Sequence, residues 1–308
     1  MAYELIADKL SRNEFVLLDG ATGTELERRG VPMDADAWCG PSVAEHGDVL
    51  SAIHQDYLNL GCDIITANTF ASGPGMLRAA GQEHNHRFLI ERAVAIAREA
   101  IAACGFEDRA VVAGSMSHMI PVLAGTDAVD PALGDVPDGF IEDCERHASA
   151  LADAGVDMIL LEMMYHPQRA AIATDAACAT GLPVWFGLSV REGGNGSPVL
   201  FDQHAERPLN ELFHLLDARV SAASIMHSRA DLVEPAIEQL RSHWNGPIVV
   251  YPDSGHFEMP QWNFNDVMTP DAFAGYAKRW RDLGCFAVGG CCGLGPEHIA
   301  QLAAWRAL

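Results

Sequence analysis

Lysine and arginine are scarce in this sequence of 308 residues. They number 20 against 42 aspartates and glutamates, so the formal net charge is −22 at pH 7. Binding to nucleic acid depends on clustered basic side chains that displace counterions, and the sequence has no such surplus. The composition therefore excludes nucleic acid and other polyanions, and we expect small molecules as partners.

Long hydrophobic runs are also missing. No stretch of about 18 or more apolar residues occurs, although a membrane-spanning helix would need one. The N-terminal segment MAYELIADKLSRNEF carries charges at Glu4, Asp8, Lys9 and Arg12, which interrupt the apolar core of a secretory signal. We therefore expect no membrane partner and a cytoplasmic location.

The sequence also lacks the spacing of a disulfide framework. Its eight cysteines are scattered along the chain, and in a reducing compartment they are expected to be free or bound to metal. Only Cys291 and Cys292 form a cluster.

What the sequence does contain is an alternation of short apolar or β-branched runs with longer helical stretches, repeated eight times. Helices are expected near residues 43–60, 84–104, 139–154, 167–180, 206–218, 231–243, 270–283 and 296–307. The strands are expected at Phe15–Asp19, Asp63–Ala67, Ala110–Ser115, Met158–Glu162, Val184–Val190, Ser221–His227, Pro247–Tyr251 and Phe286–Cys291.

Eight such units favour a closed barrel over an open doubly wound sheet, because no glycine-rich dinucleotide loop follows the first strand. We predict that residues 1–308 form one α/β domain, a (β/α)8 TIM barrel. Active sites of this fold lie at the C-terminal mouth of the barrel. Three long segments follow strands and should surround that mouth: Thr22–Pro41, Ser115–Asp138 and Arg191–Glu206.

Polar residues that are unusual for a core stand at the C-terminal ends of the predicted strands. Scattered burial of polar groups would not select one end of so many strands, whereas a site at the barrel mouth requires it. Apart from the metal-ligand candidates, we assign to substrate binding Asp19, Gly20, Thr66, Asn68, Glu162, Ser189 and Asp253.

Cys291 and Cys292 lie in the segment VGGCCG, whose glycines allow the backbone to turn around both thiols. Zinc accepts thiolate ligands and, in catalytic sites, has three protein ligands and one open position. The alternative interpretation is an ordinary pair of core cysteines. The flanking glycines at the end of a barrel strand favour the metal site.

Seven segments of the chain match one family pattern, and DGATGTEL near one end with GGCCG near the other are the most specific. Over nearly its full length the sequence resembles the homocysteine S-methyltransferase family. The matching segments are LLDGATGTELERRG at 17–30, TANTF at 66–70, VAGS at 112–115, ILLE at 159–162, VWFGLSVREGG at 184–194, VVYPDSG at 249–255 and GGCCG at 289–293.

The resemblance implies that Cys291 and Cys292 are zinc ligands. The family has a third cysteine in a Gly-x-Asn-Cys pattern, where this chain has Met226 and His227. Imidazole also binds zinc, so His227 can complete a His-Cys-Cys site; the alternative is a strand-end histidine without a metal role. Replacing a thiolate by an imidazole changes the zinc site from net negative to neutral, which holds a substrate thiolate more tightly and makes its sulfur less nucleophilic.

The resemblance also implies that Asp19 and Glu162 hold the ammonium group of homocysteine through charge-assisted hydrogen bonds. Their alternative roles are helix caps or salt bridges. The methyl donor should be a small sulfonium or quaternary ammonium ion bound by aromatic faces, for which Trp38, Tyr165 and Trp262 are candidates; each could instead only pack.

Two histidines in predicted mouth loops, His118 and His256, have no assigned role. The family more often has Gly-Pro-Tyr-Gly where this chain has residues 116–120, and Asn in place of Asp253. Both differences touch the expected pocket, so they bear on the identity of the substrates.

The sequence thus predicts a zinc-dependent S-methyltransferase in which the thiolate of homocysteine or a related amino thiol attacks a methyl group directly. The donor would be like S-methylmethionine, dimethylsulfoniopropionate or betaine. Two alternatives remain: a zinc-dependent hydrolase or lyase that binds water at the open position, and a non-catalytic barrel that binds a thiol or metal.

Overall fold

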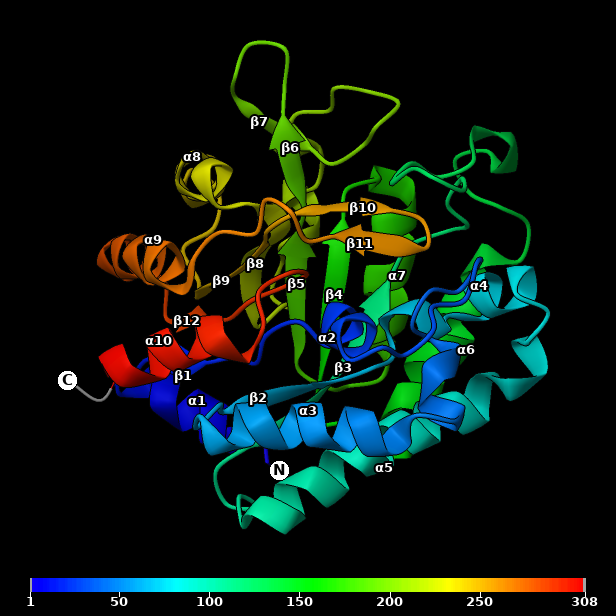
Figure 1. Ribbon diagram of the computed structural model, residues 1–308. Helices are drawn as coiled ribbons and strands as arrows, with labels where there is room; N and C mark the ends of the chain where they lie inside the picture. The colour runs from blue at the N-terminus through cyan, green and yellow to red at the C-terminus, as the bar shows by residue number, and fades with distance from the viewer. Residues whose placement is uncertain (1, 307–308) are drawn as a thin grey trace.

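A sheet of eight parallel strands forms the centre of the computed structural model, which describes residues 2–306. The strands are hydrogen-bonded in the order β1-β12-β9-β8-β5-β4-β3-β2, and a bridge between Leu18 and Ile64 joins the two end strands (Figure 1). Their bounds are β1 Val16–Leu17, β2 Ile64–Ala67, β3 Val111–Ser117, β4 Met158–Met164, β5 Val184–Leu188, β8 Ala222–Arg229, β9 Ile248–Asp253 and β12 Ala287–Val288.

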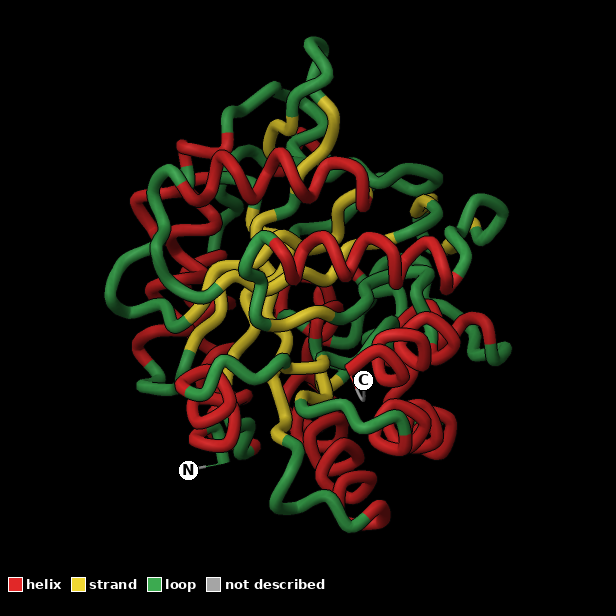
Figure 2. Tube along the Cα trace, turned by 90° about the vertical axis from the view of Figure 1, so that its left-hand side faces the viewer, coloured by secondary structure: helices red, strands yellow, loops and turns green. Residues whose placement is uncertain are grey.

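Helices lie outside this sheet, as the two views in Figures 1 and 2 show. None of the helices in the described part of the chain is long and apolar enough to cross a membrane. The helices that pack around the strands are α1 Glu4–Ser11, α3 Gly47–Asn59, α5 His86–Cys104, α6 Phe140–Ala154, α7 Pro167–Ala179, α8 Ala230–Arg241, α9 Pro270–Asp282 and α10 Pro296–Arg306. The arrangement confirms the predicted (β/α)8 TIM barrel.

One predicted helix was wrong. Residues 206–218 form two short 3-10 turns, Leu209–Glu211 and Phe213–Leu215, instead of an α-helix. The carbonyl of Arg207 accepts a hydrogen bond from the backbone N–H of Leu200, and Pro208 is extended. The segment that remains after Pro208 is too short for a stable α-helix, so it forms tighter 3-10 turns. The last predicted helix, 296–307, agrees with α10, although residue 307 lies outside the described residues.

The first and last strands are shorter than predicted, with two residues each. Beyond them the chains following β1 and β12 approach closely, and the N–H of Gly290 donates to the carbonyl of Asp19 over 3.0 Å. A side chain at Gly289 would lie 2.6 Å from that same carbonyl, so this contact requires glycine. The polar residues after both strands therefore stand on adjacent loops at the mouth.

The mouth is covered by additional short elements that the sequence did not predict. Two antiparallel hairpins follow strands β5 and β9, and two short helices follow β1 and β2 (Figure 1). Their bounds are β6 Val190–Glu192, β7 Pro198–Leu200, β10 His256–Glu258, β11 Gln261–Asn263, α2 Gly23–Arg28 and α4 Pro74–Ala79. These elements give the loops enough rigidity to position side chains over the barrel end.

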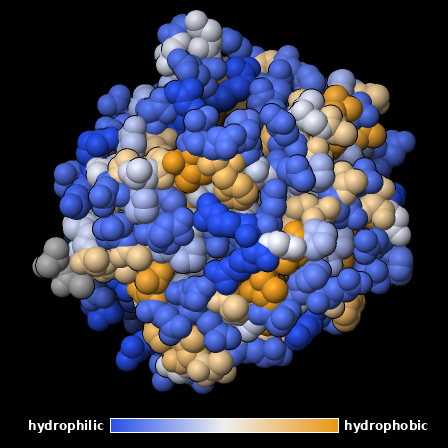
Figure 3. Space-filling view, viewed as in Figure 1, coloured by the Kyte–Doolittle hydropathy of each residue, from blue (hydrophilic) through white to orange (hydrophobic). Residues whose placement is uncertain are grey.

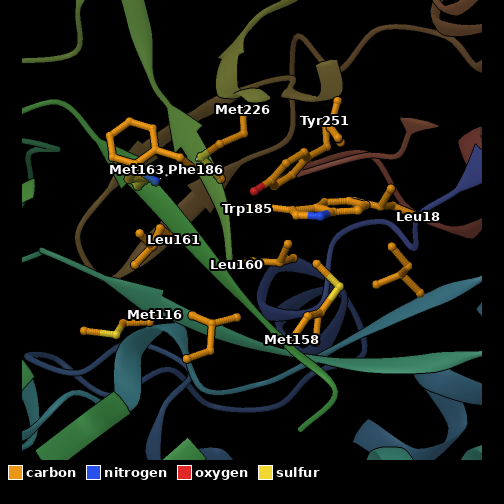
Figure 4. Close-up of a cluster of buried hydrophobic side chains, with 14 of the residues drawn as sticks. Leu18, Met116, Met158, Leu160, Leu161, Met163, Trp185, Phe186, Met226 and Tyr251 are labelled. Carbon is orange, nitrogen blue, oxygen red and sulfur yellow. Dashed lines mark hydrogen bonds between the residues drawn. The ribbon is translucent and has the colours of Figure 1, made fainter. Parts of the chain in front are cut away.

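Apolar side chains from neighbouring strands fill the interior. Figure 4 shows part of this core, with Trp185 between Leu160 and Tyr251. All three side chains are almost fully buried. The outer face in Figure 3 is mostly hydrophilic with small apolar patches, in keeping with the large negative charge. Several buried polar residues, among them Asp19, Glu162 and His227, stand at the mouth, where the candidate site lies.

Candidate active site at the barrel mouth

A cavity lies at the C-terminal ends of the strands, and most of the residues predicted for the site line it. Its walls combine carboxylates, thiols, an imidazole and aromatic rings, and none of the described residues that line it is lysine or arginine. The cavity is therefore suited to a cationic or ammonium-bearing ligand. The predicted residues that line it are Asp19, Gly20, Trp38, Thr66, Asn68, Glu162, His227, Trp262, Cys291 and Cys292.

Three of these residues form a group that could hold a metal ion. One ligand atom from each of His227, Cys291 and Cys292 lies within 4.8 Å of the others. The Sγ atom of Cys291 is 3.6 Å from Nδ1 of His227 and 3.9 Å from Sγ of Cys292. The three residues predicted as ligands are thus brought together, although one of them comes from a different strand.

The local backbone explains how these side chains reach one point. Strand β8 has a bulge between Met226 and Arg229, and His227 within it has a φ of +40°. This is a sparsely populated conformation for a residue with a side chain, and such strain is typical of functional sites. After the cysteines, Gly293 has a φ of +79°, and any side chain there would collide with the carbonyl of Ser254.

The ligand set fits zinc in both chemistry and spacing. Bonds of about 2.3 Å to sulfur and about 2.0 to 2.1 Å to nitrogen in a tetrahedron place nitrogen and sulfur about 3.6 Å apart and two sulfurs about 3.8 Å apart. The observed separations of 3.6 Å between Nδ1 of His227 and Sγ of Cys291, and of 3.9 Å between the two sulfurs, agree with these values. Contact with Cys292 and burial raise the pKa of Cys291 well above its ordinary value, so ionisation of this thiol needs a nearby cation.

Asp19 is fixed at the cavity wall by Thr66. Its carboxylate accepts the backbone N–H of Thr66 over 2.6 Å and the hydroxyl of Thr66 over 2.9 Å. Burial raises the pKa of Asp19 to about 7, and the nearby Glu162 adds to the increase. Because both acids are buried together and no lysine or arginine lines the described cavity wall, a bound cation would stabilise their ionised forms.

Glu162 is fixed in a similar way from the neighbouring strand. The hydroxyl of Ser115, in β3, donates to its carboxylate, and burial raises the pKa of Glu162 to about 7. Sequence reasoning did not include Ser115 in the site. The signal was available, because Ser115 is a polar residue near the end of β3 and therefore follows the same rule that selected the other acids and hydroxyls.

Aromatic rings form one side of the cavity next to the metal-ligand group. The ring centroids of Trp38 and Phe257 are 5.6 Å apart, and those of Phe257 and Trp262 are 6.2 Å apart. Trp262 lies 6.0 Å from the imidazole of His227, and Phe201 lies 5.4 Å from it. Phe257 and Phe201 were not predicted, since they belong to hairpin and loop segments whose conformation the sequence pattern does not reveal.

Three predicted residues do not line the cavity. Tyr165 is buried against His118, with ring centroids 4.6 Å apart. The hydroxyl of Ser189 donates a hydrogen bond to the backbone carbonyl of Met226. Asp253 lies beside the imidazole of His227, with 3.6 Å between Oδ2 and Nδ1. In these positions the three residues support neighbouring segments of the mouth and do not line the cavity.

The two histidines without an assigned role differ in their surroundings. His118 is buried, and its Nε2 accepts the backbone N–H groups of Tyr165 and His166, each over 3.0 Å. Burial holds the pKa of His118 well below its ordinary value, which leaves the neutral ring free to accept. His256, on β10, is half exposed and 3.3 Å from Glu258. His118 thus fixes the turn after β4, whereas His256 is a surface residue.

Two further predicted residues have clear packing roles as well. The side-chain amide of Asn68 donates to the carbonyl of Cys39 over 3.0 Å and accepts from its thiol over 3.3 Å, which ties the loop after β1 to the end of β2. A side chain at Gly20 would lie 2.5 Å from the carbonyl of Leu294. Both residues shape the cavity wall through backbone contacts.

The chain is similar to known proteins over most of its length. The family described as Homocysteine S-methyltransferase matches residues 16–306. The chain is 26% identical to homocysteine S-methyltransferase YbgG of Bacillus subtilis (strain 168), covering 94% of each protein, and 27% identical to the selenocysteine methyltransferase of Astragalus bisulcatus, covering 97% of this chain and 95% of that one.

A solved structure shares the fold. The metallated form of the homocysteine methyltransferase MmuM from Escherichia coli superposes with a TM-score of 0.74 at 24% identity, covering 98% of this chain and 99% of that one. Family membership favours methyl transfer over the hydrolase and the non-catalytic barrel considered from the sequence. This chain belongs to the homocysteine S-methyltransferase family and is an enzyme of that type.

Proposed function

We propose that this enzyme is a zinc-dependent S-methyltransferase that moves a methyl group from a small sulfonium or quaternary ammonium donor to homocysteine or a related amino thiol. The observation that carries the proposal is the grouping of His227, Cys291 and Cys292 at one wall of a cavity that also contains paired carboxylates and aromatic rings. When bound, zinc would supply the Lewis acidity that keeps the acceptor sulfur ionised at neutral pH.

The carboxylates support an acceptor that carries an ammonium group. Asp19 and Glu162 are buried at the cavity wall and oriented by Thr66 and Ser115. A charge-assisted hydrogen bond from an ammonium group would compensate their burial, and an acceptor without an amino group would leave both acids unpaired. Homocysteine satisfies this requirement, and so does an amino selenol of the kind named for the Astragalus relative.

The aromatic wall supports an onium donor. Trp38, Phe257 and Trp262 line the cavity beside the ligand group, and an onium methyl group is attracted to the faces of such rings. We include Phe257 in the donor site and leave out Tyr165, because Tyr165 does not line the cavity. Among the described lining residues there is no lysine or arginine that would repel a cation.

The reaction that this geometry supports is an in-line displacement. The acceptor sulfur attacks the methyl carbon, the bond from that carbon to the donor sulfur or nitrogen breaks, and the donor leaves as a neutral thioether or amine. The chain contributes mainly by positioning: the acids fix the acceptor and the rings fix the donor, so that both are held in one reactive geometry.

The test is elemental analysis of the purified protein together with a donor screen. We expect about one zinc per chain and the formation of methionine from homocysteine with S-methylmethionine, dimethylsulfoniopropionate or betaine, followed by mass spectrometry. Zinc without methyl transfer from any onium donor would contradict the donor class. Methyl transfer by protein that contains no metal would contradict the zinc dependence.

A further inference from the structure

Helix α2 lies against the β10–β11 hairpin at the mouth of the barrel (Figure 1). The two carboxylate oxygens of Glu27, on α2, accept the backbone N–H of Trp262 over 3.0 and 3.1 Å. The hairpin has two strands, so within the described residues β11 has no strand partner on its other side. The carboxylate of Glu27 thus binds a backbone group that a third strand would otherwise bind.

The indole of Trp262 is held at a second point. Its Nε1 donates to the carbonyl of Ser254 over 3.1 Å, and the backbone N–H of Ser254 donates to the carbonyl of Cys292 over 2.9 Å. A side chain at Gly255 would lie 2.5 Å from the indole nitrogen, so this close packing requires glycine. Trp262 is therefore fixed to α2 through its backbone and to the metal-ligand loop through its ring.

The same face of α2 also contacts the metal-ligand loop directly. The hydroxyl oxygen of Thr24 accepts the N–H of Gly293 over 3.0 Å, and the guanidinium of Arg28 donates to the carbonyl of Gly293 over 3.3 Å. Residues three and four positions apart share one face of a helix, so Glu27 projects on the same side as Thr24 and Arg28. One helix face therefore joins the loop after Cys292 to the hairpin of the aromatic wall.

Glu27 is also close to Trp38, the ring of the aromatic wall that comes from the loop after α2. Burial raises the pKa of Glu27, and the N–H of Trp262 and the indole of Trp38 reduce that increase. The indole nitrogen of Trp38 is buried, although it forms no regular hydrogen bond with the described residues. The carboxylate thus stands next to two of the three rings of the wall, and it does not itself line the cavity.

We propose that Glu27 is a positioning residue for the donor site, which holds Trp262 and Trp38 in place from outside the cavity. This inference rests on the proposed function, since it requires an onium donor at the aromatic wall. The place of the rings relative to Cys292 sets how far the donor methyl group lies from the acceptor sulfur. Because the displacement needs both reactants in line, a displaced wall would weaken donor binding and slow the transfer.

The test separates position from charge with two substitutions in the full-length enzyme. Glu27→Gln keeps an oxygen at the same reach and loses the charge, whereas Glu27→Asp keeps the charge and withdraws both oxygens by one methylene. With whichever of S-methylmethionine, dimethylsulfoniopropionate and betaine the wild type accepts, Glu27→Asp should raise the KM for the donor about 10-fold. Glu27→Gln should leave it nearly unchanged. The KM for homocysteine and the zinc content should change little in both variants.

Glu258→Asp is the matched control. Glu258 is a carboxylate of the same hairpin, but it is 61% exposed and contacts His256. Its substitution should leave the KM for both substrates unchanged. A second measurement needs no turnover: quenching of tryptophan fluorescence by tetramethylammonium gives the dissociation constant of an onium ion, which should rise in Glu27→Asp and not in Glu27→Gln.

A wild-type donor KM in Glu27→Asp, or equal losses in the Asp and Gln variants, would overturn the inference and leave the proposed function intact. An equal rise in the KM for donor and acceptor would also overturn it, because Glu27 would then act on the fold of the whole mouth. Wild-type enzyme that transfers no methyl group from any onium donor would instead overturn the proposed function, and the inference with it. Glu27→Ser repeats the comparison with no acceptor at this reach, and thermal unfolding identifies a variant that misfolds.

Discussion

The imidazole Nδ1 of His227 lies 3.6 Å from the thiol Sγ of Cys291, although 64 residues separate them in the chain. The contact joins the bulge of β8 to the loop after β12 across the mouth of the barrel. Because both elements are held by strands of the barrel sheet, we expect the site to keep its shape without a ligand. Predictions about these residues therefore concern metal and substrate binding more than folding.

Removing one thiol should separate metal binding from stability. We expect Cys292→Ser to abolish zinc retention and methyl transfer, because two ligands bind a catalytic zinc too weakly. The melting temperature of the metal-free protein should change by only a few degrees, because the side chain is only partly buried and lies at the mouth. Elemental analysis and thermal unfolding check both expectations. Methyl transfer by a metal-free Cys292→Ser variant would contradict the mechanism.

Substituting His227 should distinguish an imidazole ligand from a bystander. His227→Ala should lower zinc affinity severely, whereas His227→Cys should retain zinc with three sulfur ligands. X-ray absorption at the zinc edge is the measurement, since one nitrogen at about 2.0 to 2.1 Å should accompany sulfurs at about 2.3 Å in the wild type and disappear in the Cys variant. A wild-type spectrum with sulfur and oxygen neighbours only would show that His227 is not a ligand.

The two departures from the family pattern meet in space. His227 stands where the family has Cys, Asp253 stands where the family more often has Asn, and the two side chains are 3.6 Å apart. The sequence displayed both changes but could not show that they are neighbours, because 26 residues and a strand crossover separate them. Only the bulge in β8 brings them to the same level.

The aromatic wall should determine the affinity for the donor. We expect Phe257→Leu and Trp262→Leu to raise the KM for the methyl donor about 5- to 30-fold, as the loss of one cation–π contact at a desolvated site predicts, and to leave the KM for the acceptor nearly unchanged. Tyr165→Phe is the control, because Tyr165 does not line the cavity. Steady-state kinetics with both substrates varied gives the answer, and a larger effect from Tyr165→Phe would restore Tyr165 to the donor site.

The sequence predicted the site well where it depends on strand ends and poorly where it depends on loops. Parallel strands of a barrel end at the same face, so Asp19, Glu162 and Cys291 could be placed together without coordinates. Phe257 could not, because its position depends on how the short hairpin β10–β11 folds over the mouth. The hairpin strands have three residues each, too few for a clear alternation.

The absence of two predicted residues from the cavity wall has a related cause. Ser189 and Tyr165 follow strand ends, but neighbouring residues of a strand point to opposite sides, and a bulge changes that alternation. Strand β4 has such an irregularity between Leu161 and Met164, so the direction of Tyr165 could not be derived from the sequence. The lengths and positions of the predicted strands located the barrel mouth, but they did not show which side chains face the cavity.

The acceptor site should depend on Glu162. Glu162→Gln removes the charge but keeps an oxygen that can accept from Ser115. Losing a charged partner for an ammonium group costs about 1.5 to 3 kcal/mol, so the KM for the acceptor should rise about 10- to 100-fold. The KM for the donor should change little. Ser189 does not line the cavity, and its hydroxyl donates to the backbone carbonyl of Met226, so Ser189→Ala should affect neither KM and serves as the control.

Glu162→Gln should also stabilise the protein at high pH. Burial raises the pKa of Glu162 from 4.5 to about 7 in the folded protein. Between these values the folded state holds a proton that the unfolded state has lost, so this group makes the free energy of unfolding fall as pH rises from about 4.5 to about 7, and the loss persists above pH 7.

A glutamine at this position does not ionise. Glu162→Gln should therefore raise the melting temperature of the chelator-treated, substrate-free protein, and raise it more at pH 8 than at pH 5. Thermal unfolding at both values measures the difference, with Ser189→Ala as a variant expected to show no pH-dependent gain. An equal change at the two pH values would mean that Glu162 keeps its charge without a bound ammonium group, and that its burial is compensated within the protein itself.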